Sequence, residues 1–134
     1  MNYQEYVKTL FSGACLASCY AVLARNKFDW VQVTEDILDG VEKGYLDKDC
    51  FVSHPVQYLG MMGLKIRDIE KVYINDLSQL PDNKLYVVEY KKKPEDKASH
   101  FVIAKDKKVY FDPSDSSVTV QIGKPFSWRR LITI

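Results

Sequence analysis

The sequence predicts an α+β domain in which N-terminal helices pack on a mostly antiparallel C-terminal sheet. In the first half of the chain, apolar residues recur at helical spacing, whereas from residue 64 onward short runs alternate apolar with charged residues. Short turns join these runs, and such turns suit antiparallel neighbours because parallel strands need longer crossovers. The 134 residues contain no repeat or linker, which indicates one domain spanning 1–134.

Two helices are expected before residue 30. The segment 3–11 (YQEYVKTLF) is a short amphipathic helix or helical turn that ends near Ser12 and Gly13. Residues 15–25 are almost continuously apolar and rich in alanine, which is too long a run for a typical strand. They predict a buried helix that ends at Asn26.

Two further helices are expected before the sheet. The segment TEDILDGVEKG has Thr34 as a cap, acidic residues in its first turn and Gly44 at its close. The segment HPVQYLGMMG places Pro55 near a first helical position and stops at Gly63.

The second half of the chain predicts strands. They are rich in β-branched and aromatic residues and are separated by turn residues. The predicted runs cover residues 64–73, 84–93, 99–108, 108–113, 117–123 and 129–134.

Composition excludes several classes of protein. The net charge of +1 gives no bulk attraction to nucleic acid or to a membrane surface. The charged run 91–97 (KKKPEDK) is interrupted by two acids and is interpreted as a solvated hairpin tip rather than a nucleic-acid patch. No apolar run approaches the roughly 20 residues that span a bilayer. The N-terminus lacks a signal-peptide pattern, so we expect a cytoplasmic protein without a membrane span.

The cysteines are expected to be free thiols. Their number is three, which argues against a disulfide framework, and a reducing compartment would keep them reduced. No CxxC motif occurs, and the only two histidines, His54 and His100, are far apart in the sequence. Neither a metal site nor an organic cofactor is therefore expected.

Cys15 is the better candidate nucleophile of the two neighbouring cysteines. It follows Ser12, Gly13 and Ala14 at the expected start of a helix, where free N–H groups and the helix dipole lower the pKa of a thiol. Small residues before it would let a substrate approach closely. Cys19 lies one turn further in among apolar residues, where burial would raise its pKa.

His100 is the better candidate base. It opens the strand SHFVIA, which is followed by a turn and the strand VYFDP, so a hairpin would return Asp112 close to His100. The carboxylate could then hold one imidazole nitrogen and leave the other facing the thiol, as in a nucleophile, base and orienter triad. His54 precedes Pro55 in a loop, and the sequence predicts no carboxylate partner for it.

The order of these residues resembles that of the papain-like cysteine peptidases. CLASCYAVL after a small-residue loop, followed by HFVIAKDKKVYFDPSD, is most similar to the bacteriocin-leader (double-glycine) peptidase group and its uncharacterised relatives. The resemblance implies a papain-like fold and a Cys15, His100 and Asp112 triad that hydrolyses a peptide or isopeptide bond through a thioester. It implies a peptide or protein substrate and no cofactor.

The sequence departs from that pattern around the nucleophile. Ala14 and Leu16 flank the cysteine, and Thr9 stands where the family supplies a glutamine that donates to the oxyanion. Gln4 is the nearest glutamine and is the candidate for that role. A second alignment starts the papain-like helix at CYAVLA and makes Cys19 the nucleophile. Because the glutamine is missing at position 9 and Leu16 follows the cysteine, a non-catalytic papain-like binding or interaction module is the alternative function.

Overall fold

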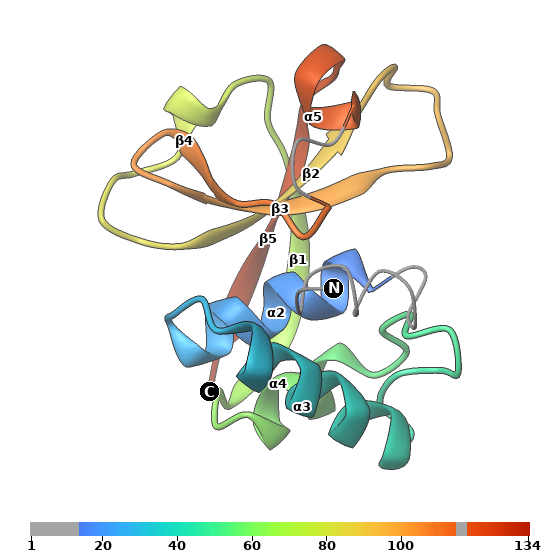
Figure 1. The fold of residues 1–134 in the computed structure, drawn as a ribbon. Helices are drawn as coiled ribbons and strands as arrows, with labels where there is room; N and C mark the ends of the chain where they lie inside the picture. The colour runs from blue at the N-terminus through green and yellow to red at the C-terminus, as the bar shows by residue number, and fades with distance from the viewer. Residues whose placement is uncertain (1–13, 115–117) are drawn as a thin grey trace.

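The computed structural model describes residues 14–114 and 118–134, and it is an α+β structure. Figure 1 shows the first helices gathered on one side of a sheet built from the second half of the chain. The helices are α2 (Cys15–Arg25), α3 (Trp30–Glu42), α4 (Pro55–Met61), the 3₁₀ helix η1 (Leu77–Gln79) and α5 (Val118–Ile122). The strands are β1 (Ile66–Tyr73), β2 (Tyr86–Lys91), β3 (His100–Lys105), β4 (Lys108–Phe111) and β5 (Lys124–Thr133).

The five strands form one sheet in the order β1-β5-β2-β3-β4. Every neighbouring pair is antiparallel, as the alternating pattern and the short turns predict. The last strand, β5, lies between β1 and β2, so the sheet is completed by the most C-terminal strand. The coarse prediction of N-terminal helices followed by an antiparallel sheet is confirmed.

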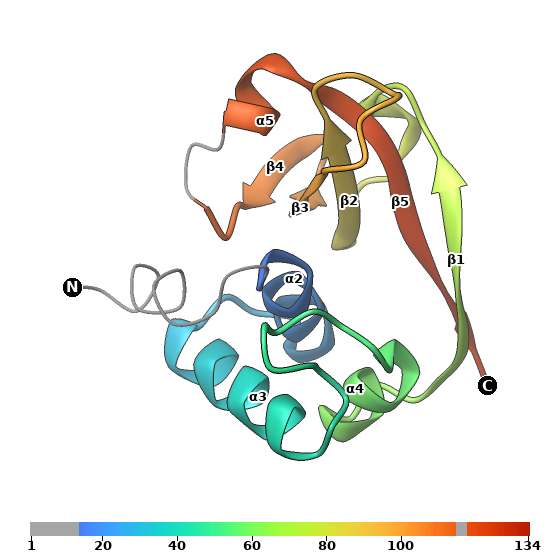
Figure 2. The same cartoon turned by 90° about the vertical axis from the view of Figure 1, so that its right-hand side faces the viewer.

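Helix α2 lies between the sheet and helix α3, as Figure 2 shows. In its middle, Ala17, Ser18, Cys19 and Ala21 are small and fully buried, which lets the helix approach both neighbours closely. The helix ends at Arg25, as predicted, because Asn26 takes the left-handed conformation at φ 54° and closes the last turn. The segment expected as an earlier helix, 3–11, lies outside the described residues.

Helix α3 begins four residues before the predicted cap at Thr34, so that prediction is wrong. Asp29 is the true cap, because its carboxylate accepts a hydrogen bond from the Val31 N–H at 3.0 Å. The Thr34 hydroxyl instead donates to the Trp30 carbonyl at 2.8 Å from inside the helix. Helix α4 begins at Pro55 as predicted.

The predicted strand at 117–123 is also wrong, because the structure forms helix α5 at Val118–Ile122. The Gly123 N–H donates to the Thr119 carbonyl at 2.9 Å and closes this single turn. A Cβ at Gly123 would lie 2.5 Å from the Lys91 carbonyl oxygen, so only glycine permits the close approach of the two backbones. Strand β5 begins at the next residue and is therefore longer than the predicted 129–134.

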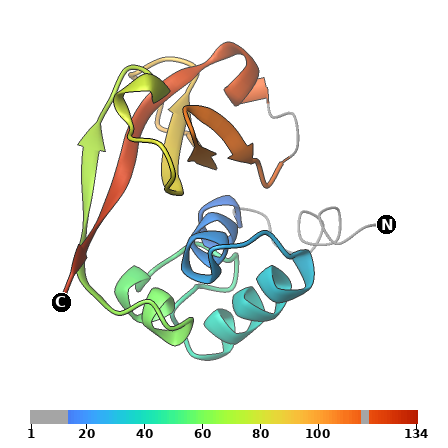
Figure 3. The same cartoon turned by 90° about the vertical axis from the view of Figure 1, so that its left-hand side faces the viewer.

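The sheet separates two apolar cores. The larger core lies between the sheet and the helices and includes Tyr58 and Ile103. The smaller core lies on the other face, where Val88 and Val102 pack with residues of the η1 region. Figure 3 shows that the sheet is curved. Strand β2 contributes to both cores, and its residues Tyr86 to Tyr90 are all buried.

Candidate functional site

Cys15 is the first residue of α2, and its side chain is partly exposed. The start of this helix packs against β3, so the thiol lies against the first residues of that strand. The backbone N–H groups of Phe101 and Leu16 lie near the Cys15 sulfur and lower the pKa of the thiol. The prediction that Cys15 begins this helix is confirmed.

His100 is the first residue of β3 and lies opposite Tyr90 of β2. A tight turn with Asp106 and Lys107 in the left-handed conformation reverses the chain into β4. Asp112 follows β4 directly, and its Oδ1 lies 2.6 Å from Nε2 of His100. The hairpin therefore places the carboxylate beside the imidazole, as the sequence predicts.

The imidazole bridges the carboxylate and the thiol. Nε2 is engaged by Asp112, and the His100 side chain also lies close enough to Cys15 to lower the pKa of the thiol. The other ring nitrogen, Nδ1, is therefore the one available to the sulfur. Asp112 is fixed in turn, since its Oδ1 also accepts the Ser114 N–H at 2.9 Å. Three residues from separate elements thus converge in the arrangement of nucleophile, base and orienter.

The electrostatics of the pair favour the charged forms of both groups. Burial raises the pKa of Cys15, but the hydrogen bond from His100 and the Phe101 N–H outweigh burial, and the pKa falls below the ordinary 9.0. Burial lowers the pKa of His100, but the hydrogen bonds with Asp112 and Cys15 raise it to about 9. Both shifts favour a thiolate paired with an imidazolium ion.

The other two cysteines lie in different surroundings. Cys19 is fully buried, and burial together with the nearby Cys15 raises its pKa well above the ordinary value. Cys50 is buried in the loop before α4, where burial and Asp47 raise its pKa to about 11. In this structure Cys15, not Cys19, meets His100.

Two expectations from the resemblance concern residues outside the described ranges. Gln4, the candidate oxyanion donor, and Thr9, which occupies the expected glutamine position, both lie in the segment before residue 14.

A metal-binding group of three or more His, Cys, Asp or Glu side chains does not occur among residues 14–114 and 118–134. In the same ranges, no helix is both long and apolar enough to cross a bilayer.

A polar network on the helix-facing side of the sheet was not predicted. Glu89 of β2 is buried and accepts a hydrogen bond from the Ser127 hydroxyl at 2.7 Å. Nη1 of Arg129 donates to the Ser127 oxygen at 2.8 Å, and Nζ of Lys71 lies 3.4 Å from Glu89. Because β2 is buried on both faces, alternation of apolar and polar residues along its sequence could not show that Glu89 lies on the face toward the helices.

A hollow of about 280 Å³ adjoins this network. Helix α2 contributes Leu16 and Tyr20 to its lining, and strands β1 and β5 contribute Ile69, Lys71 and Arg129. Val52 and Pro55, before and at the start of α4, complete the lining. Leu16 directly follows Cys15 in α2, although Cys15, His100 and Asp112 do not themselves line the hollow.

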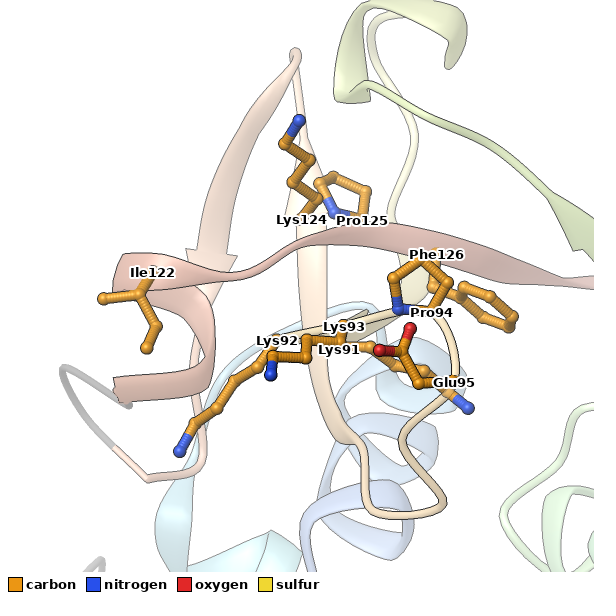
Figure 4. Close-up of a pocket in the computed structure, with 9 residues that line it drawn as sticks. All are labelled: Lys91, Lys92, Lys93, Pro94, Glu95, Ile122, Lys124, Pro125 and Phe126. Atoms are coloured by element: carbon orange, nitrogen blue, oxygen red, sulfur yellow. The ribbon is translucent and has the colours of Figure 1, made fainter.

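A second hollow of about 380 Å³ lies where β2 ends and β5 begins (Figure 4). Lysines 91, 92, 93 and 124 line it together with Phe126 and other apolar side chains. Nζ of Lys91 donates to the Asp96 carbonyl at 2.6 Å and lies 4.5 Å from the centre of the Phe126 ring. None of the Cys15, His100 and Asp112 cluster lines this hollow. Lys92, Lys93 and Glu95 are exposed, as predicted for a solvated tip.

The chain belongs to the family described as "Protein of unknown function, DUF261", which matches residues 5–132. No curated protein and no solved structure matches the chain.

Proposed function

We propose that this member of the family is a cysteine-dependent hydrolase of papain-like fold that cleaves a peptide or isopeptide bond. The observation that carries the proposal is the position of His100, which bonds Asp112 through Nε2 at 2.6 Å and lies close enough to Cys15 to lower the pKa of its thiol. A structural role does not require a cysteine, a histidine and an aspartate from three elements to meet in this order.

The geometry supports attack by a thiolate. The sulfur of Cys15 would attack the substrate carbonyl carbon, and the carbonyl oxygen would take the negative charge. The first turn of α2 has backbone N–H groups without acceptors inside the helix, and the Cys15 N–H is one candidate donor to that oxygen. Burial around the thiol strengthens these interactions because little water screens them.

His100 would serve both half-reactions. As an imidazolium ion it would donate its proton to the leaving amine, which breaks the amide bond and leaves a thioester on Cys15. The neutral imidazole would then accept a proton from water, and the hydroxide would attack the thioester. This step releases the carboxylic acid and restores the thiolate and imidazolium pair. Asp112 would hold the ring in place through both steps.

The papain-like fold is part of the same proposal. It is supported by a helix that starts at the cysteine and packs on an antiparallel sheet, with the histidine at the start of one strand and the aspartate after the next. These are the features for which the sequence resembles the papain-like peptidases.

The test is site-resolved alkylation with iodoacetamide at pH 6.5–7, followed by mass spectrometry of the peptides that contain each cysteine. We expect Cys15 to react about tenfold faster than free cysteine, because its thiolate fraction is larger. Cys19 and Cys50 should react far more slowly. A mixture of fluorogenic peptide amides should be cleaved by the native chain and by Cys19→Ala, but not by Cys15→Ala. A Cys15 that reacts no faster than free cysteine would leave a non-catalytic binding module as the better interpretation.

A further inference from the structure

The hollow beside Cys15 has an unusual distribution of charge. Lys71 and Arg129 lie opposite each other on β1 and β5, and one buried carboxylate, Glu89, lies near both of them. Glu89 is also bonded by Ser127, and these partners outweigh its burial and hold its pKa below the ordinary value. The ionised Glu89 balances one of the two cations. The wall therefore keeps one net positive charge.

Arg129 is held in place on several sides. Its Nη1 donates to Ser127, and its guanidinium lies close enough to the Tyr20 hydroxyl to oppose the rise in pKa that burial causes there. The guanidinium carbon lies 5.1 Å from the centre of the Phe101 ring. Burial raises the pKa of Tyr20 to about 12, so this phenol is neutral and does not cancel the positive charge.

Phe101 links Arg129 to the candidate nucleophile. The backbone N–H of Phe101 reaches the Cys15 sulfur, while its ring supports the guanidinium of Arg129. On the opposite side, Leu16 follows Cys15 and forms a wall of the hollow. A group bound in the hollow would therefore lie next to the bond that the thiolate attacks.

The shape and lining of the hollow fit a short aliphatic stem with an anionic head. Its volume of about 280 Å³ is that of roughly nine water molecules, at about 30 Å³ each. Leu16 and the apolar residues near α4 would contact the stem. The planar guanidinium of Arg129 retains donors suited to a carboxylate, which it can bind through two parallel hydrogen bonds.

We propose that this hollow is a substrate subsite that selects a carboxylate next to the scissile amide bond, with Arg129 and Lys71 as its specificity determinants. The carboxylate belongs to an acidic side chain or to a chain terminus. This inference rests on the proposed function, because it assigns the substrate class of the same site.

The test uses alkylating probes in matched acidic and neutral pairs. N-iodoacetyl-glutamic acid α-amide is compared with N-iodoacetyl-glutamine α-amide, and N-iodoacetyl-glycine with its amide. In each reaction the Cys15 sulfur forms a bond to the probe's CH₂ carbon and iodide leaves. We expect Cys15 to react about three- to tenfold faster with the acidic member of at least one pair, and the preference to fall in high salt. The first pair reports a side-chain carboxylate and the second a terminal one.

The variants test whether the preference for acidic probes comes from the hollow or from the positive charge of His100. Arg129→Gln and Lys71→Gln should each reduce the preference toward parity, and Arg129→Lys should restore part of it. Lys71 is partly exposed, so its replacement keeps the test valid if loss of Arg129 unfolds the chain. Lys92→Gln removes the same charge at an exposed position outside the hollow and should keep the preference.

The outcomes distinguish this inference from the proposed function. If Cys15 reacts rapidly with all four probes and shows no acidic preference, the subsite assignment is wrong and the hydrolase proposal stands. A preference that persists in both the Arg129→Gln and Lys71→Gln variants would also overturn the assignment, because His100 would then be its source. If Cys15 reacts with every probe no faster than free cysteine, the proposed function itself fails.

Discussion

The chain contains two regions in which a cysteine and a histidine occur, and only one of them forms a pair. In the loop before α4, Cys50 and His54 are close in sequence, but burial raises the pKa of Cys50 and His54 Nδ1 is 3.1 Å from the Ser53 hydroxyl. At the start of α2, Cys15 meets His100 from a distant strand, and its pKa is lowered. A reactive thiol therefore depends on elements that converge in space, not on residues that are neighbours in sequence.

Replacing each histidine gives the largest expected contrast between the two regions. His100→Ala removes the hydrogen bond to the Cys15 sulfur and leaves burial to raise its pKa, so hydrolysis should fall by about 10²–10⁴-fold. His54→Ala should change the rate little, because His54 is exposed and its side chain makes no helix-capping hydrogen bond. Turnover of the fluorogenic amides measures both. Loss of activity in His54→Ala with normal activity in His100→Ala would reverse the assignment of the two regions.

Removing the charge of Asp112 should have a smaller effect. Asp112→Asn keeps the size of the side chain but no longer stabilises the imidazolium form of His100, so the pKa of Cys15 should rise. Each unit of that rise leaves about tenfold less thiolate at pH 7. The iodoacetamide rate of Cys15 at pH 7, compared with its rate at pH 10, measures the change. An equal loss at both pH values would point to damage of the fold instead.

The pH dependence of alkylation should show the same contrast within one sample. The rate for Cys15 should rise through a pKa below 9.0, since its folded thiolate is stabilised, whereas the rate for Cys50 should rise only near pH 11. His100 gains its proton more readily in the folded state. Its charge therefore contributes stability that is complete below pH 6.5 and is lost as the pH rises to about 9. If the alkylation rates of Cys15 and Cys50 rise over the same pH range, the two thiols do not differ in pKa and this prediction is wrong.

Replacing Cys50 should give the smallest effect on chemistry. Cys50 is buried and has a φ of 67°, so it fills space in a tight loop. Cys50→Ala should lower the free energy of unfolding by about 1 kcal/mol through lost packing, while the alkylation rate of Cys15 stays unchanged. Urea denaturation and site-resolved labelling measure the two quantities. A slower Cys15 in this variant would mean that the two regions are coupled.

The candidate triad was predictable because each member lies at an element boundary with a local signal. Small residues precede Cys15 in the sequence, and a short turn between two β-rich runs returns Asp112 to His100. The polar network was not predictable in this way. Glu89 lies in a strand that is buried on both faces, so no alternation of apolar and polar residues in its sequence shows which face Glu89 occupies. Arg129 comes close to Glu89 only because segments that are distant in the sequence pair in the sheet.

The errors in secondary structure have local causes. In α3 the acidic Asp29 caps the helix before Thr34, which has the same capping chemistry but lies inside the first turns. In α5 the residues VTVQI favour a strand by composition, yet the sheet already has β5 beside the end of β2. Tertiary contacts therefore override a weak local preference.

The position of β5 in the sheet determines the order in which the helices and strands can assemble during synthesis. Strands β2, β3 and β4 are consecutive hairpins, so they and α2 can assemble as soon as residue 112 has left the ribosome. Strand β1 has β5 as its neighbour in the sheet and must wait for it with an open edge. Cys15 and His100 can thus meet in a nascent chain before Arg129 arrives. Any selection of substrate by Arg129 begins only after β5 has been synthesised and has paired with β1 and β2.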